Sequence, residues 1–134
     1  MKKYFPYIIV LLIAAGIFGY MQYNKPHRDI AAENSNFTMT ANELFDAFEN
    51  DETNANGMFL DKVISVSGKI IDIAANQDGK NVITLEAENA LLGGVLCTLK
   101  EDDETLKIDE NAVLKCRCTG FLSDVILVDC TVEK

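Results

Sequence analysis

The chain has 134 residues, of which 49% are hydrophobic and 25% are charged, enough for one domain of about 100 residues plus an additional element. From residue 36 to residue 134 it carries 19 acidic and 8 basic side chains, a formal charge of −11. Such a surface repels phosphate backbones, so the composition argues against general nucleic-acid binding.

The first 24 residues (1–24) predict an N-terminal transmembrane signal anchor. Residues 4 to 24 carry no charge, and a helix of that length spans roughly 30 Å, the thickness of a bilayer's hydrocarbon core. All four tyrosines lie near its two ends, as in an aromatic belt. A cleaved signal peptide is the alternative, although Ile17 fits poorly before a cleavage site at Gly19. No cysteine lies near residue 20, which excludes a lipoprotein anchor.

The charges that flank this segment predict its orientation. Lys2 and Lys3 precede it, Lys25 and Arg28 follow it, and a short N-terminal tail before a long domain favours a cytoplasmic N-terminus. Paired cysteines in a small domain also suit an oxidising compartment. We therefore expect a single-pass membrane protein whose C-terminal domain is periplasmic or extracellular.

Residues 25–37 are polar and predict an extended linker, in which the single histidine, His27, is an exposed residue. Residues 40–56 predict one amphipathic helix that ends near Gly57. Thr40 and Glu43 match a capping box, apolar side chains recur at helical spacing, and the acidic face is most simply a solvated one.

From residue 62 onward the hydrophobic period changes from that of a helix to that of strands. We expect strands over residues 62–75, 80–88, 93–99, 112–121 and 124–132, with a bulge or bend at Gly68 and a hairpin turn at Asp78-Gly79. Five short strands after a helix predict a mainly β domain over residues 38–134, built as a small closed or partly open barrel.

The four cysteines are the candidate site residues, as structural disulfides: Cys97, Cys116, Cys118 and Cys130. The alternation points Cys116, Cys118 and Cys130 inward, and a tight turn sets either Cys116 or Cys118 opposite Cys130. Cys97 is available to the remaining thiol, and the sequence does not choose among the three connectivities. A C-x-C pair within a strand presents zinc ligands poorly, and a C-x-x-C redox motif is absent.

Other clusters carry little chemistry. Residues 101–104, all acidic, lack the glycine and the spacing of a calcium loop, and Gly93-Gly94 lacks the residues of a phosphate-binding loop. No serine has a histidine or lysine base at a recognisable spacing. We therefore expect no enzymatic activity and no metal or other cofactor.

Five ordered segments carry a resemblance to a known family: YNKPHRDI, TANELFDAFENDE, LDKVISVSGKI, GVLC and CTGFLSDVILVDC. From about residue 23 to residue 132 they closely resemble the bacterial tRNA_anti-like family. The resemblance implies an OB fold like that of some anticodon-binding domains, here with its helix on the N-terminal side. Cys97, Cys118 and Cys130 match positions where the family often has cysteine, whereas Cys116 is less usual. The family supplies no established functional residues.

An OB fold commonly binds ligands on its second and third strands and the adjoining loops. Single-stranded nucleic acid requires exposed aromatic side chains and a basic groove there. Phe121 is the only aromatic residue between residues 62 and 134, and the basic residues on strands are few: Lys62, Lys69, Lys115 and Arg117.

We therefore expect a non-catalytic, membrane-anchored module outside the cytoplasm that binds a protein or a cell-envelope ligand. The alternative is a nucleic-acid-binding OB domain that faces the cytoplasm. A third hypothesis, an enzyme or metal-dependent stress protein, depends only on the cysteines and the acidic clusters.

Overall fold

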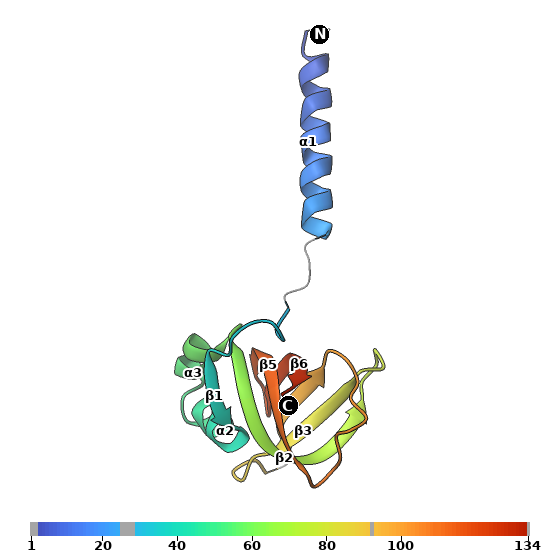
Figure 1. Ribbon diagram of the computed structural model, residues 1–134. Coiled ribbons are helices and arrows are strands. Elements are labelled where there is room, and N and C mark those ends of the chain that lie inside the picture. The colour runs from blue at the N-terminus through green and yellow to red at the C-terminus, as the bar shows by residue number, and fades with distance from the viewer. Residues whose placement is uncertain (1–2, 25–28, 92, 134) are drawn as a thin grey trace.

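The computed structural model describes residues 3–24, 29–91 and 93–133. Its first helix, α1 (Phe5–Tyr23), has no buried residue and extends away from the globular part of the chain (Figure 1). By length and composition this helix could cross a membrane. Pro6 lies in its first turn, where a missing N–H costs no hydrogen bond. Lys2, Lys25, His27 and Arg28 lie outside the described residues, so the expected orientation stays a prediction.

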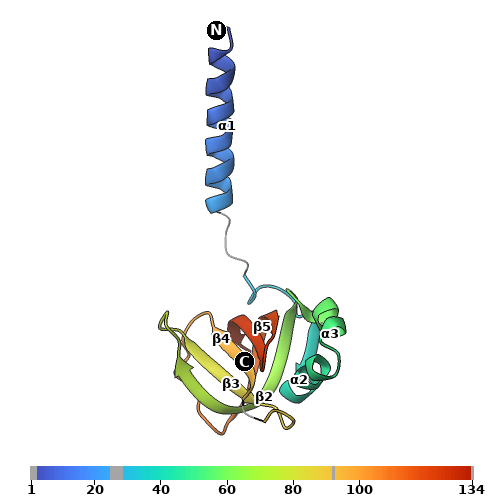
Figure 2. The ribbon, with the colours of Figure 1, turned by 180° about the vertical axis from the view of Figure 1, so that it is seen from behind.

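Five strands form a closed barrel, which confirms the predicted mainly β OB fold. They are β2 (Val63–Ala75), β3 (Asn81–Glu86), β4 (Gly94–Leu99), β5 (Asn111–Phe121) and β6 (Val125–Val132). The strand order is β2-β3-β4-β6-β5, and pairing between β5 and β2 closes the barrel. The β4–β6 pair is parallel and the other pairs are antiparallel. Figures 1 and 2 show this barrel from opposite sides.

The long strand β2 reaches both of its barrel neighbours because it changes partner along its length. Its first half, through Lys69, pairs with β5, and its second half, from Ile70, pairs with β3 across an irregularity between Ile70 and Asp72. The change occurs beside Gly68, where an added Cβ atom would lie 3.1 Å from the Cβ atom of Ala41. The missing side chain therefore lets the first turn of the preceding helix, which begins at Ala41, approach the strand. Gly68 is also where the sequence predicts a bulge or bend.

Two helices, and not one, cover the barrel: α2 (Ala41–Asn50) and α3 (Glu52–Phe59). The capping box is present, since the Thr40 hydroxyl accepts from Glu43 N at 3.2 Å and a Glu43 carboxylate oxygen accepts from Thr40 N at 2.8 Å. The expectation of one continuous helix was wrong because Asp51 leaves the helical conformation (φ −154°) and its carboxylate accepts from Asn54 N at 3.1 Å. Asp51 thereby caps a new helix.

The chain is already in contact with the barrel before α2. Ile30 is fully buried. Asn36 N donates a hydrogen bond to the Val63 carbonyl at 2.7 Å, and Val63 N donates one to Asn36 Oδ1 at 3.1 Å. Strand β1 (Phe37–Thr40), which the sequence pattern does not predict, pairs in parallel with the start of β2. From residue 29 onward, the segment expected as a linker is therefore ordered against the domain.

Candidate functional site

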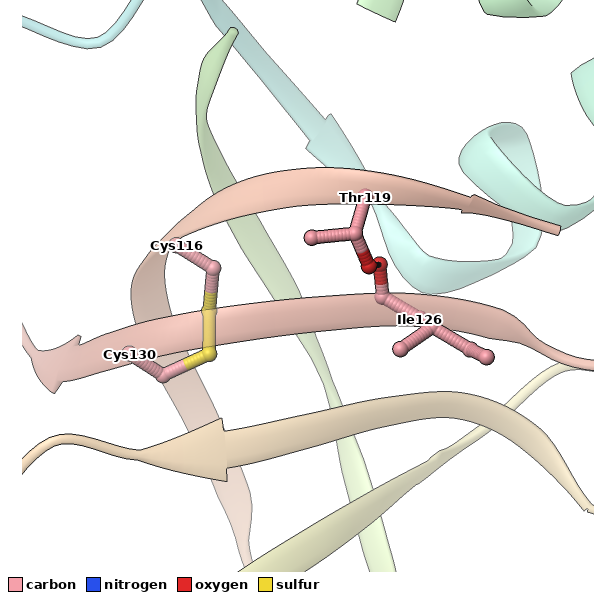
Figure 3. The surroundings of a disulfide bond; sticks show 4 residues. All are labelled: Cys116, Thr119, Ile126 and Cys130. Carbon is pink, nitrogen blue, oxygen red and sulfur yellow. Dashed lines mark hydrogen bonds between the residues drawn. A yellow bond between two sulfur atoms is a disulfide. The ribbon is translucent and has the colours of Figure 1, made fainter. Parts of the chain in front are cut away.

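All four cysteines project into the barrel and are fully buried. Cys116 on β5 and Cys130 on β6 form a disulfide with their Cα atoms 4.2 Å apart. Figure 3 shows this bond joining the two adjacent strands, with the Thr119 hydroxyl donating to the Ile126 carbonyl at 3.0 Å on the same pair. The sequence left either Cys116 or Cys118 opposite Cys130, and in the structure it is Cys116 that bonds to Cys130.

A bulge decides which cysteine meets Cys130. Lys115 pairs with Thr131 but Arg117 pairs with Val128, so Cys116 faces two residues of β6, Asp129 and Cys130. Asp129 takes the left-handed conformation (φ 53°) that lets β6 accommodate the additional residue. The inward direction of Cys130 on this strand therefore depends on a local irregularity that strict alternation does not contain.

Cys97 and Cys118 are free thiols. Burial raises the pKa of both, and for Cys118 a backbone hydrogen bond from Gly120 partly opposes the shift. The sulfur atoms of Cys97, Cys116 and Cys130 lie within 4.8 Å of one another. Two of them belong to the disulfide, and three thiolates here would place several negative charges in an apolar interior. This group is therefore better suited to a structural role than to metal binding.

The outer face of β3 and β4 corresponds to the usual ligand face of an OB fold. By alternation with the buried Ile83, Leu85, Val95 and Cys97, its outward positions are Val82, Thr84, Glu86, Leu96 and Thr98, and β2 contributes Asp72 beside Thr84. None of these side chains is aromatic or basic. This face therefore offers neither a stacking surface nor a positive groove.

Of the basic residues predicted on strands, Lys62 precedes β2, whereas the others lie on β2 or β5 and two of them pair with acidic groups. Arg117 contacts Asp61 and Asp129, each at 3.2 Å, and Lys69 contacts Asp109 at 3.3 Å. Lys115 donates to a backbone carbonyl, that of Ala31, at 3.4 Å. These contacts serve the domain itself, so they do not assemble a stripe for phosphate groups.

The acidic residues 101–104 and the glycine pair have local structural partners. Asp102 accepts from Asn81 N at 3.0 Å and Asp103 accepts from Thr105 N at 2.9 Å. Gly94 N donates to Asp124 Oδ1 at 2.8 Å, which ties the β3–β4 loop to the β5–β6 turn. Both features thus fix loops.

Comparisons with known proteins agree with the fold. The chain can be superposed on a Klebsiella pneumoniae lipoprotein, described as a candidate nucleic acid-binding protein, with a TM-score of 0.56 at 18% identity. That alignment covers 82% of this chain and 100% of the other, and at this identity it shows the fold alone. No curated protein matches the sequence. The model of the tRNA_anti-like family matches residues 1–132, and the chain therefore belongs to the tRNA_anti-like family.

Proposed function

We propose that this protein is a membrane-anchored OB-fold module that holds its domain outside the cytoplasm and binds a protein or a cell-envelope ligand without catalysing a reaction. The observation that carries the proposal is the outer face of β3 and β4. Its outward side chains are apolar, hydroxyl-bearing or acidic, such as Leu96, Thr98 and Glu86. Such a face lacks the groups that stack on bases or pair with phosphates, which favours a protein or envelope ligand over a nucleic acid.

Three observations support a location outside the cytoplasm. The helix α1 is long and apolar enough to serve as an anchor. The Cys116–Cys130 disulfide suits an oxidising compartment. The Klebsiella pneumoniae protein of the same fold is a lipoprotein.

Binding of single-stranded nucleic acid is the second candidate function, because that same structural neighbour is described as a candidate nucleic acid-binding protein. The formal charge of −11 on residues 36–134 opposes it, since each approaching phosphate adds repulsion that only high salt screens.

The test of location joins alkaline phosphatase to the C-terminus of the full chain, with a green fluorescent protein fusion as the matched control. We expect an active phosphatase, a dark fluorescent fusion, and Cys116 and Cys130 resistant to alkylation until a reductant is added. The opposite pattern of reporters, or alkylation of both cysteines without reduction in the unfolded chain, contradicts the proposed location.

The test of ligand class uses fluorescent single-stranded RNA and DNA oligonucleotides with the purified full chain. We expect no change in anisotropy at low salt, where electrostatic binding is strongest. Binding that weakens steeply as salt is added would establish the second candidate in place of the first.

A further inference from the structure

We infer that the ligand of this module is a protein segment of apolar and basic side chains, which docks at the helix-covered end of the barrel around Phe121. The inference deepens the proposed function, because it depends on the module binding a protein. We call this place the Phe121 surface and define it by Phe121, Leu60, Leu91, Leu122, Glu49 and Glu52.

Phe121 is the shared wall of two hollows. One has a volume of about 410 Å³ and is also lined by Leu60 and Leu122, and the other has a volume of about 280 Å³ and is also lined by Leu91. The Phe121 ring also packs against the rings of Phe45 and Phe48 in the core, with ring centroids 5.8 and 5.7 Å apart. The wall is therefore rigid and continuous with the aromatic part of the core.

The leucines around these hollows have a large part of their surface exposed. The exposed fraction is 46% for Leu60, 75% for Leu122 and 99% for Leu91, because no sheet or helix of the described chain covers these side chains. Isolated exposed leucines are ordinary, but three that line two hollows with one shared wall form a patch of the kind that binds partners.

The charge at the rim of the Phe121 surface indicates the charge of the partner. Glu52 lines the larger hollow and Glu49 lines the smaller one, and no described Lys or Arg lines either. Glu49 lies in the last turn of α2, which has no basic residue, and Glu52 lies in the first turn of α3. The two carboxylates favour a cation, so the partner carries Lys or Arg next to its apolar side chains.

Hydrogen bonds hold the loops of this surface in place before any partner binds. Asp124 Oδ1 accepts from Gly94 N at 2.8 Å, which fixes the turn of Leu122 to the loop of Leu91. The same loop is fixed to α2, because Asn89 Nδ2 donates to Asp46 Oδ1 at 2.6 Å and Glu88 N donates to Asn42 Oδ1 at 2.7 Å. A preformed surface loses little entropy on binding.

The test uses the full chain in nanodiscs of neutral phosphatidylcholine, with empty nanodiscs as the blank. The probe is a fluorescein-labelled amphipathic peptide of leucine and lysine, and a leucine–glutamate peptide of equal length is its control. We expect the leucine–lysine peptide alone to bind. Its Kd should rise about tenfold or more in the Leu91→Ser/Leu122→Ser variant, because each exposed leucine loses apolar contact.

Two further variants separate charge and position. Glu49→Lys/Glu52→Lys should weaken the leucine–lysine peptide by about tenfold and allow the leucine–glutamate peptide to bind. Ile108→Ser is the matched control, because Ile108 is 51% exposed and lines neither hollow, and it should leave the Kd unchanged. All substituted side chains are at the surface, so circular dichroism should show folded variants.

Several outcomes overturn the inference. The inference fails if the leucine–lysine peptide does not bind, or if Ile108→Ser weakens its binding as much as Leu91→Ser/Leu122→Ser does. Methyl resonances of Leu96 and Val82 that shift in place of Leu60 and Leu122 would locate the ligand on the β3–β4 face, which leaves the proposed function intact. Conversion of a dimer to a monomer by Leu91→Ser/Leu122→Ser would assign the surface to a second copy of this chain. Failure of the location or oligonucleotide tests concerns the proposed function and not this surface.

Discussion

Reduction of the Cys116–Cys130 disulfide should cost the domain a large part of its stability. The bond joins residues 14 apart in sequence, so it closes a small loop in the unfolded chain. For a loop of this size the chain-entropy relation gives about 3 kcal/mol in the free energy of unfolding at 25 °C. Reduction keeps both sulfur atoms in the core, so this figure contains little contribution from lost packing.

The assay is urea unfolding of the full chain in a mild detergent, followed by the β signal in circular dichroism with and without a phosphine reductant. With a denaturant slope of about 1 to 3 kcal/mol per molar, a loss of about 3 kcal/mol lowers the unfolding midpoint by about 1 to 3 M. Mass spectrometry after alkylation counts the thiols at each step.

The matched control is the Cys116→Ala/Cys130→Ala variant, whose midpoint should not respond to reductant. An unchanged midpoint in the natural sequence, with four alkylated thiols to prove reduction, would refute the reasoning. It would mean that the hairpin of β5 and β6 persists in the unfolded chain and that the loop was already closed.

Three smaller predictions follow from single residues. Because burial raises the pKa of the Cys97 thiol, the stabilisation from its neutral form is complete below about pH 8.5, and the free energy of unfolding then falls as the pH rises. In urea titrations of Cys97→Ala this fall should be smaller by about 1.4 kcal/mol per pH unit, and the buried Cys118 thiol should account for the remainder. Gly93→Ala should lower the free energy of unfolding by about 2 kcal/mol, because φ is +95° and the new Cβ atom would lie 2.3 Å from Asp124 Oδ1. Gly79→Ala places its Cβ atom in open space and should cost about 1 kcal/mol. Equal decreases in the melting temperature of the two variants would contradict this difference. Thr40→Ala should cost about 1 kcal/mol through loss of the α2 cap, and helicity that is unaffected in urea would argue against that role.

The strands of the barrel could be predicted from sequence because they are rich in Val, Ile and Leu and are bounded by turn residues, although β2 and β3 bury consecutive side chains, at residues 63–66 and 83–85, in place of strict alternation. Strand β1 could not, since four residues such as Phe37–Thr40 hold too few alternations to differ from a loop. The break between α2 and α3 was hidden for a different reason. The apolar spacing of Phe48, Ala55 and Phe59 continues across it, and only the conformation of Asp51 interrupts the helix.

The site was less predictable than the fold because it depends on registers and on loop contacts. Cys116 and Cys118 share one strand face, so the two-residue period places both equally well against Cys130, and the bulge at Asp129 decides between them. The Phe121 surface joins α2, α3 and two loops that lie far apart in sequence. No local pattern brings Leu91 to Leu122, although the lone aromatic residue after residue 62 was a usable signal.

The β5–β6 hairpin has a consequence for how the molecule matures. It supplies both remaining seams of the barrel, β5 to β2 and β6 to β4. Without it, β2, β3 and β4 form an open meander with an unpaired edge on each side. A truncated form that lacks β6 therefore exposes adhesive edges that quality-control proteases and chaperones recognise.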